Sequence, residues 1–233
     1  MEKMIFFQVL VLCSQLVGLL GITLIGVWMG KYLGGFAWDG SDQQFNLHPL
    51  LMTVGLIFLY AEAMLVYRVF RNTTKIYIKC LHGMIHLLAL ICAVIGLKAV
   101  FDNHNFNGIT NMYSLHSWIG ITTVVLFSLQ LLCGFVSFLV PGVSRTLRAS
   151  YLPTHVFFGV FIFGMAVASA LMGITEKLLF TLDNYSDLPA EARIANTAGI
   201  CFLVFAGIIG YLVTRHDFKR EEVDYEHEPL AMD

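Results

Sequence analysis

The sequence is poor in charged residues, which make up only 13% of its 233 residues. A soluble domain carries about 25% charged residues, so this chain has too few to cover a surface that faces water. Hydrophobic residues account for 58% of the chain, against about 45–50% in a soluble domain. We therefore expect a single membrane domain and no separate soluble domain.

Common metal-binding and nucleic-acid-binding signatures are also missing. The five cysteines stand alone, without CxxC or CxxCH spacing, which argues against a zinc ribbon and a covalently attached c-type haem. Lone cysteines in apolar segments are typical of helix packing. No cluster of lysine and arginine indicates a nucleic-acid partner, and no clear internal repeat divides the chain.

Six apolar stretches are present, and each is long enough to cross a membrane as a helix, which takes about 20 residues. They lie at residues 5–32, 47–70, 76–101, 115–139, 152–179 and 195–213. The sequence thus predicts an all-α, polytopic protein with six transmembrane helices in one domain over residues 1–214. A short cytoplasmic tail is predicted over 215–233. Spans two to five are expected to form a central four-helix bundle, where facing helices can hold an interior cofactor.

Lysine and arginine are distributed unequally between the two sets of span ends. One set of ends carries only Lys31, Lys98, Lys177 and Arg193. The other carries Lys3, Arg68, Arg71, Lys75, Lys79, Arg145, Arg148, Arg215, Lys219 and Arg220. Positive residues favour the cytoplasmic side, so both termini are predicted to be cytoplasmic. The loops 33–46, 102–114 and 180–194 are then lumenal or extracellular, and Asn184 in the last of them begins a sequon that permits glycosylation.

Histidines are concentrated inside or at the ends of the predicted spans, where five of the eight lie. Ionisable side chains in membrane helices are costly and are candidates for function. His48 and His116 begin spans that enter from the lumenal side, whereas His82, His86 and His155 lie early in spans that enter from the cytoplasm. The histidines therefore form two sets, one near each face of the membrane.

Two imidazoles near each face, drawn from two helices, suit two haems with both axial positions filled. Such ligation leaves no open position for oxygen and favours electron transfer. One haem near one face cannot relay an electron across a hydrocarbon core of about 30 Å, whereas two haems divide that distance. The spacing leaves open whether His82 or His86 is a ligand, because the two lie four residues apart on one helix face and also resemble a zinc pair.

A histidine-lined transporter for protons or a divalent metal is the alternative. Such a transporter is expected to carry carboxylates in mid-membrane, and Glu62 is the only strong acid in the middle of a span. Glu62 follows His48 by fourteen residues, close to four helical turns, which places it on the same interior-facing side. There it is expected to be protonated, to pair with Arg68 or to line a haem pocket. Glu176 and Lys177 are expected at the membrane interface.

Five short strings around these histidines resemble the cytochrome b561 family of ascorbate-dependent transmembrane oxidoreductases. They are FNLHP at 45–49, LVYRVFR at 65–71, KCLHG at 79–83, YSLHSW at 113–118 and PTH at 153–155. The resemblance runs from about residue 35 to residue 220. It implies a lumenal haem held by His48 and His116 and a cytoplasmic haem held by His82 and His155, both of b type and non-covalent. His86 is then only a neighbour.

The resemblance also implies an enzyme that passes electrons from cytosolic ascorbate to monodehydroascorbate or a ferric chelate on the lumenal side. Lys75, Lys79 and Arg148 match the residues that hold ascorbate in the family. Arg68 lies near the same entry, and an anionic donor suits this cationic ring. Charge that merely sets topology is the alternative explanation of these residues. On the lumenal side, His104, Tyr113 and Ser114 precede His116 and are candidates for holding the acceptor, with an interfacial tyrosine as the alternative for Tyr113.

Location and assembly are less marked in the sequence. The segment EHEPLA at 226–231 approaches an acidic dileucine sorting signal but has Ala231 where a second leucine or isoleucine belongs. We expect an endomembrane location, in late endosomes, lysosomes or secretory vesicles, with the plasma membrane as the alternative. Members of the family are often homodimers, so the resemblance implies a homodimer surrounded by membrane lipid.

Overall fold

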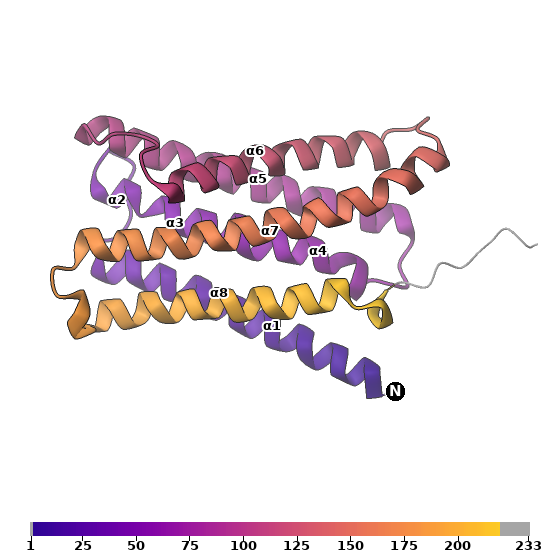
Figure 1. Ribbon diagram of the computed structural model, residues 1–233, viewed down its shortest axis with the longest axis horizontal. Helices are drawn as coiled ribbons and strands as arrows, with labels where there is room; N and C mark the ends of the chain where they lie inside the picture. The colour runs from indigo at the N-terminus through magenta and orange to yellow at the C-terminus, as the bar shows by residue number, and fades with distance from the viewer. Residues whose placement is uncertain (1, 220–233) are drawn as a thin grey trace, which may run out of the picture.

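The computed structural model describes residues 2–219, and over that range the chain forms helices and connecting turns without a strand. Six helical segments are long and apolar enough to cross a membrane, which confirms the predicted all-α fold with six spans (Figure 1). Five spans contain the continuous α-helices α1 (Glu2–Val27), α5 (Lys75–Asn107), α6 (Leu115–Phe138), α7 (Arg145–Thr181) and α8 (Ala190–Thr214). A short π-helix, η1 (Trp28–Tyr32), extends α1. Arg220 and the segment 226–231 lie outside the described residues.

The second span is a composite of several short helices. It consists of α2 (Asp42–Phe45), α3 (Leu47–Met52), the π-helix η2 (Thr53–Leu59) and α4 (Tyr60–Val69). A π-helix bonds residue i to residue i+5 and is therefore wider than an α-helix. Residues on either side of η2 consequently do not keep the 3.6-residue phase that an uninterrupted α-helix would give them.

Two helices extend well beyond the apolar stretches predicted from the sequence. The third span was predicted at 76–101 and the fifth at 152–179, whereas α5 continues to Asn107 and α7 begins at Arg145. Hydropathy marks only the part of a helix that lies in lipid, and backbone hydrogen bonding continues until a cap ends it. Ser144 provides such a cap, because its side chain accepts a 3.2 Å hydrogen bond from the backbone N–H of Leu147. His82 and His155 thus lie two and almost three turns inside their helices.

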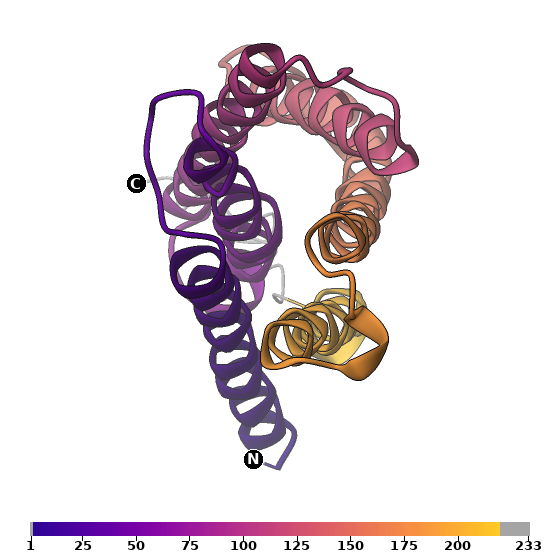
Figure 2. The same ribbon diagram turned by 90° about the vertical axis from the view of Figure 1, so that its left-hand side faces the viewer.

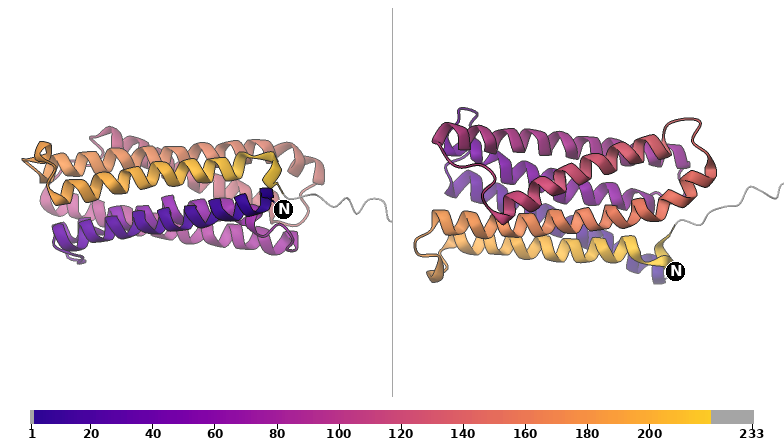
Figure 3. Two further views of the ribbon diagram at one scale, coloured as in Figure 1. Left: turned by 90° about the horizontal axis from the view of Figure 1, so that it is seen from below. Right: turned by 45° about the horizontal axis from the view of Figure 1, so that its top comes forward.

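Four of the six spans form a ring, and the other two, α1 and α8, lie together at its side (Figure 2). The second span packs against α5, α5 against α6, α6 against α7, and α7 closes the circle against α3, η2 and α4. This is the four-helix arrangement expected of spans two to five. α1 and α8 pack together, and they cover one side of the ring through contacts with α7, η2 and α4 (Figure 3).

One end of the bundle carries most of the positive charge. The beginning of α1, the end of α8 and the turns that join α4 to α5 and α6 to α7 all lie at this end (Figure 1). We call it the basic end, and it carries Lys3, Arg68, Arg71, Lys75, Lys79, Arg145, Arg148, Arg215 and Lys219. The opposite end carries the connections from α1 to α2, α5 to α6 and α7 to α8, with Lys31, Lys98, Lys177 and Arg193.

Candidate functional site

Two histidines from α3 and α6 face each other near the opposite end. The ring centroids of His48 and His116 are 6.1 Å apart. Nδ1 of His48 lies 3.2 Å from the carbonyl oxygen of Gly96, and Nδ1 of His116 lies 2.8 Å from that of Ser169. A carbonyl can only accept, so each Nδ1 carries the proton and Nε2 is the nitrogen left to bind a metal.

A second pair lies near the basic end. The rings of His82 on α5 and His155 on α7 have centroids 6.2 Å apart, nearly the same separation as in the first pair. Nδ1 of His82 lies 2.7 Å from the carbonyl oxygen of Ala63 on α4. Nδ1 of His155 is buried without a hydrogen-bond partner. We call His48 with His116 the opposite-end pair and His82 with His155 the basic-end pair.

Glycines on the neighbouring helices leave room for two of the four rings. A Cβ added to Gly173 on α7 would lie 2.7 Å from Cε1 of His116, and one added to Gly134 on α6 would lie 2.9 Å from Cε1 of His155. Cβ atoms essentially never come this close to another heavy atom. Both histidine positions therefore require glycine on the helix that faces them.

The geometry of both pairs fits a haem iron between the two rings. A bond from a metal to an imidazole nitrogen is about 2.0 Å long, so two rings on opposite sides of one ion have centroids roughly 6 Å apart. Carbonyl oxygens orient three of the four rings, as is usual for metal-ligating histidines. Within residues 2–219, no group of three or more His, Cys, Asp or Glu side chains could hold a metal ion. Each pair would therefore offer two imidazoles, and no further ligand of these types, to such a group.

The two pairs lie at well-separated depths in the bundle. On α5, Gly96 orients His48 and follows His82 by fourteen residues. On α7, Ser169 orients His116 and follows His155 by the same number. At 1.5 Å per residue, fourteen residues of α-helix span about 21 Å, so two independent helices give the same separation.

His86 lies beside the basic-end pair, deeper in the bundle. Its ring centroid is 4.5 Å from that of His82 and 4.9 Å from that of Tyr60, in edge-to-face contacts. The side chain is buried, and its Nδ1 has no hydrogen-bond partner. The ring that faces His155 within contact distance is that of His82. The geometry therefore favours His82 over His86 as the ligand opposite His155.

The cations at the basic end do not all point the same way. Lys79 is half-buried and donates a 3.1 Å hydrogen bond to the carbonyl oxygen of Phe138, and Arg148 is among the cations that face it. Lys75 is exposed at the start of α5, and its charge also faces Lys79. Arg68 differs, because it is buried and its guanidinium donates to the carbonyl oxygens of Val213 and Arg215 on the α8 side.

The candidate acceptor residues lie at the end of α5 and on the loop between α5 and α6. His104 on α5 and Asn111 are in hydrogen-bond contact at 3.2 Å. Ser114 caps α6 and donates a 3.2 Å hydrogen bond to Glu176 on α7. Tyr113 is exposed, and its partial desolvation and the negative charge of Glu176 raise the pKa of its hydroxyl. The three predicted residues thus share one end of the bundle, but the structure shows no direct hydrogen bond between any two of them.

Lys177 occupies a position that its expected interfacial role does not explain. Its ammonium group lies 4.1 Å from the centre of the Phe45 ring. The Phe45 ring is in turn 6.1 Å from the ring of His48. Phe45 stands three residues before His48, and that spacing is the one sequence signal of its nearness to the histidine. No comparable signal exists for Lys177, because it comes from a helix more than 120 residues further along the chain.

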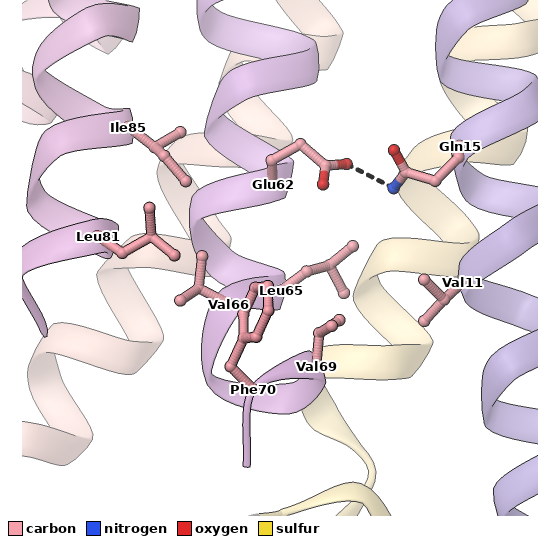
Figure 4. Close-up of a pocket in the computed structure, with 9 residues that line it drawn as sticks. All are labelled: Val11, Gln15, Glu62, Leu65, Val66, Val69, Phe70, Leu81 and Ile85. Carbon is pink, nitrogen blue, oxygen red and sulfur yellow. Dashed lines mark hydrogen bonds between the residues drawn. The ribbon is translucent and has the colours of Figure 1, made fainter. Parts of the chain in front are cut away.

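Glu62 does not share the side of the second span that carries His48, so the expectation from fourteen-residue spacing was wrong. The π-helix η2 lies between the two residues and breaks the phase on which that expectation relied. The carboxylate accepts a 2.7 Å hydrogen bond from Gln15 on α1 (Figure 4). Both side chains line a pocket of about 260 Å³ with Leu81 and Ile85 of α5. Glu62 therefore pairs with Gln15 rather than Arg68.

Several known proteins have sequences similar to this chain. The sequence profile of the eukaryotic cytochrome b561 family matches residues 47–181, which include all four paired histidines. The chain is 50% identical over 221 residues to the transmembrane ascorbate-dependent reductase CYB561 of Pongo abelii, covering 94% of this chain and 87% of the relative. The corresponding protein of Homo sapiens is 49% identical with the same coverage. The plasma membrane ascorbate-dependent reductase CYBRD1 of Xenopus laevis is 46% identical, with 94% and 79% covered.

Proposed function

Because the chain belongs to the eukaryotic cytochrome b561 family, we propose that it is a transmembrane oxidoreductase that carries electrons from ascorbate across the bilayer. The family uses b-type haem, and we propose two such haems in this chain. His82 and His155 would hold one, and His48 and His116 the other. The observation that carries the proposal is the pairing of the rings at 6.2 Å and 6.1 Å, about 21 Å apart along the bundle.

The basic end is proposed to face the cytoplasm. Positively charged residues near span ends favour that side, and the described part of the chain places nine lysines and arginines at this end against four at the other. The basic-end pair would then be the cytoplasmic site and the opposite-end pair the lumenal or extracellular site. The endomembrane location, the homodimer and the glycosylation of Asn184 stay predictions from the sequence.

Each ring has a defined part in this mechanism. When bound, each haem would supply one-electron redox chemistry. The two imidazoles of a pair would hold the haem iron and would leave no position open to oxygen. The carbonyl oxygens of Gly96, Ser169 and Ala63 hold three of the rings in one tautomer, with Nε2 directed away from the hydrogen bond. Fixed rings require little rearrangement when the charge at the site changes by one electron.

Ascorbate, a monoanion, is proposed to bind at the basic end against Lys75, Lys79 and Arg148. Lys79 stands three residues before His82 and shares its helix face, so a donor held there lies close to the basic-end pair. The Nε of Arg148 is buried without a hydrogen-bond partner, and an anionic oxygen would satisfy it. Arg68 is left out of this proposal, because its donors already serve the carbonyl oxygens of Val213 and Arg215.

The transporter alternative has little support in the geometry. It would need carboxylates near the histidines, but Glu62 faces Gln15 on α1. In the part of the chain that the structure describes, each histidine pair also lacks a third protein ligand of the usual metal-binding types.

The visible absorption spectrum of the purified protein, with haem quantified per chain, tests the proposed function. We expect two haems per chain and low-spin α and β bands that sharpen when ascorbate is added. A colourless protein from cells supplied with haem would refute the proposal. Metal-dependent flux through a colourless protein in liposomes would establish the transporter instead.

A further inference from the structure

The ring of Phe45 is the centre of a cluster at the opposite end of the bundle. The Lys177 ammonium group lies 4.1 Å from its centre. The ring of His104 lies nearly parallel to it, with centroids 6.4 Å apart and planes inclined by 15°. The ring of His48, one of the opposite-end pair, is 6.1 Å away. One aromatic ring therefore connects a cation, a second imidazole and a histidine proposed to hold a haem.

Lys177 is distinguished by its surroundings from the other three cations at this end. Lys31, Lys98 and Arg193 are exposed, whereas Lys177 is half-buried. Lys98 forms an ion pair with Asp102 at 2.8 Å, four residues along the same helix. Among residues 2–219, no carboxylate lies within 4.0 Å of the Lys177 ammonium group.

The acidic side chains around Lys177 are already engaged or stand at a distance. Asp42 and Glu191 are the acids whose charge faces it. Glu191 accepts a 2.7 Å hydrogen bond from the indole N–H of Trp28. Glu176, its neighbour in the chain, accepts a hydrogen bond from Ser114. A half-buried ammonium group that has three donors and lies over an aromatic ring has hydrogen-bonding capacity left for an anion.

We propose that Lys177, held against Phe45, is the residue that selects anionic one-electron acceptors at the opposite end of the bundle. The acceptors that it would favour are small anions with carboxylate or enolate oxygens, such as a ferric carboxylate chelate or monodehydroascorbate. This inference rests on the proposed function and assigns to Lys177 the choice of its acceptor by charge. The acceptor gains one electron, and the haem held by His48 and His116 loses one. For a ferric chelate, Fe(III) becomes Fe(II) without transfer of any atom.

The position of the site explains why a cation is useful there. An anion held against Lys177 would lie next to the Phe45 ring, and that ring separates it from His48 by one aromatic contact. A positive charge attracts anionic acceptors to a surface and orients them. It gives no such advantage to a cationic acceptor. The charge of the acceptor is therefore the variable that separates a binding role for Lys177 from a packing role.

The test uses the full chain in liposomes loaded with ascorbate, with the opposite end facing outward. The acceptors outside are ferric citrate and ferricyanide, both anionic, and hexaammineruthenium(III), which is cationic. Loss of one charge-assisted hydrogen bond changes affinity by roughly tenfold or more. We expect Lys177→Gln to raise KM for both anions by about that factor, with little change in KM for the cation. Lys177→Arg, which keeps the charge, should remain close to the unsubstituted protein.

Lys98→Gln is the matched control, because it removes a lysine at the same end that is exposed and already paired with Asp102. It should leave KM for all three acceptors unchanged. Haem content and the rate of haem reduction by ascorbate are measured on every variant. Equal KM values for the anions in Lys177→Gln and the unsubstituted protein would overturn the inference. An equal rise in KM for the cationic acceptor in Lys177→Gln would also overturn it. So would the same rise in KM for the anions in Lys98→Gln. Failure of ascorbate to reduce the unsubstituted protein would instead refute the proposed function.

Discussion

Nδ1 of His116 lies 2.8 Å from the carbonyl oxygen of Ser169, a residue of the same helix that carries His155. α7 therefore supplies one ring of the basic-end pair and orients one ring of the opposite-end pair. α5 does the same, since it carries His82 and its Gly96 orients His48. Two continuous helices thus set the separation of both pairs.

Replacing a paired histidine should remove one haem and leave the other. His116→Ala or His48→Ala is expected to lower the haem content from two per chain to one, because a single imidazole leaves one axial position empty. His82→Ala or His155→Ala should remove the other haem. Haem quantification and redox titration distinguish the two products. Full haem content in His82→Ala together with loss in His86→Ala would show that His86 is the ligand.

Gly173→Ala should disturb the opposite-end pair selectively. The new Cβ would lie 2.7 Å from Cε1 of His116, and overpacking of this kind costs about 1–3 kcal/mol. We expect a reduced content or altered low-spin spectrum of the haem held by His48 and His116. Gly164→Ala, on the same helix with nothing within 4 Å of the added Cβ, is the control. Identical spectra for the two variants would contradict the close approach of Gly173 to the His116 ring.

Lys79→Gln should weaken the use of ascorbate without loss of haem. Removing a cation that binds a monoanion is expected to raise KM for ascorbate by roughly tenfold, measured as the rate of haem reduction in a stopped-flow instrument. Arg71→Gln is the control, because its guanidinium lies over the Phe7 ring, 4.9 Å from the ring centre, on the α1 side. If the kinetics of haem reduction are unchanged in Lys79→Gln, Lys79 does not bind ascorbate. The positive charge at this end would then serve only to set the orientation of the chain in the membrane.

Gln15→Leu should destabilise the protein through Glu62. The substitution leaves a half-buried carboxyl group without its 2.7 Å partner, which costs about 1–3 kcal/mol of the free energy of unfolding. The double variant Gln15→Leu/Glu62→Leu should recover most of that loss, because it removes both polar groups from the pocket. Thermal unfolding measures both effects. Haem content should be unaffected in the double variant, and its loss would place Glu62 in a haem pocket after all.

The number and type of the elements could be predicted because they depend on local properties of the chain. Six apolar stretches of sufficient length predict six spans, and the described part of the chain has six helical segments that can cross a membrane. The ends of α5 and α7 could not be predicted in the same way, since helical hydrogen bonding passes from the apolar stretch into polar residues. The π-helix η2 also escaped prediction, and with it the direction of Glu62.

The sequence by itself determined how many times the chain crosses the membrane, which end of the bundle is basic and near which end each histidine lies. These follow from hydrophobic length, charge and position within a span. Spacing alone left His82 and His86 open, and the tertiary structure brings the ring of His82 opposite His155. Only the tertiary structure decided that Lys177 lies over Phe45. These relationships join residues from helices far apart in the chain, so they depend on the packing and rotation of whole helices, which no local pattern specifies.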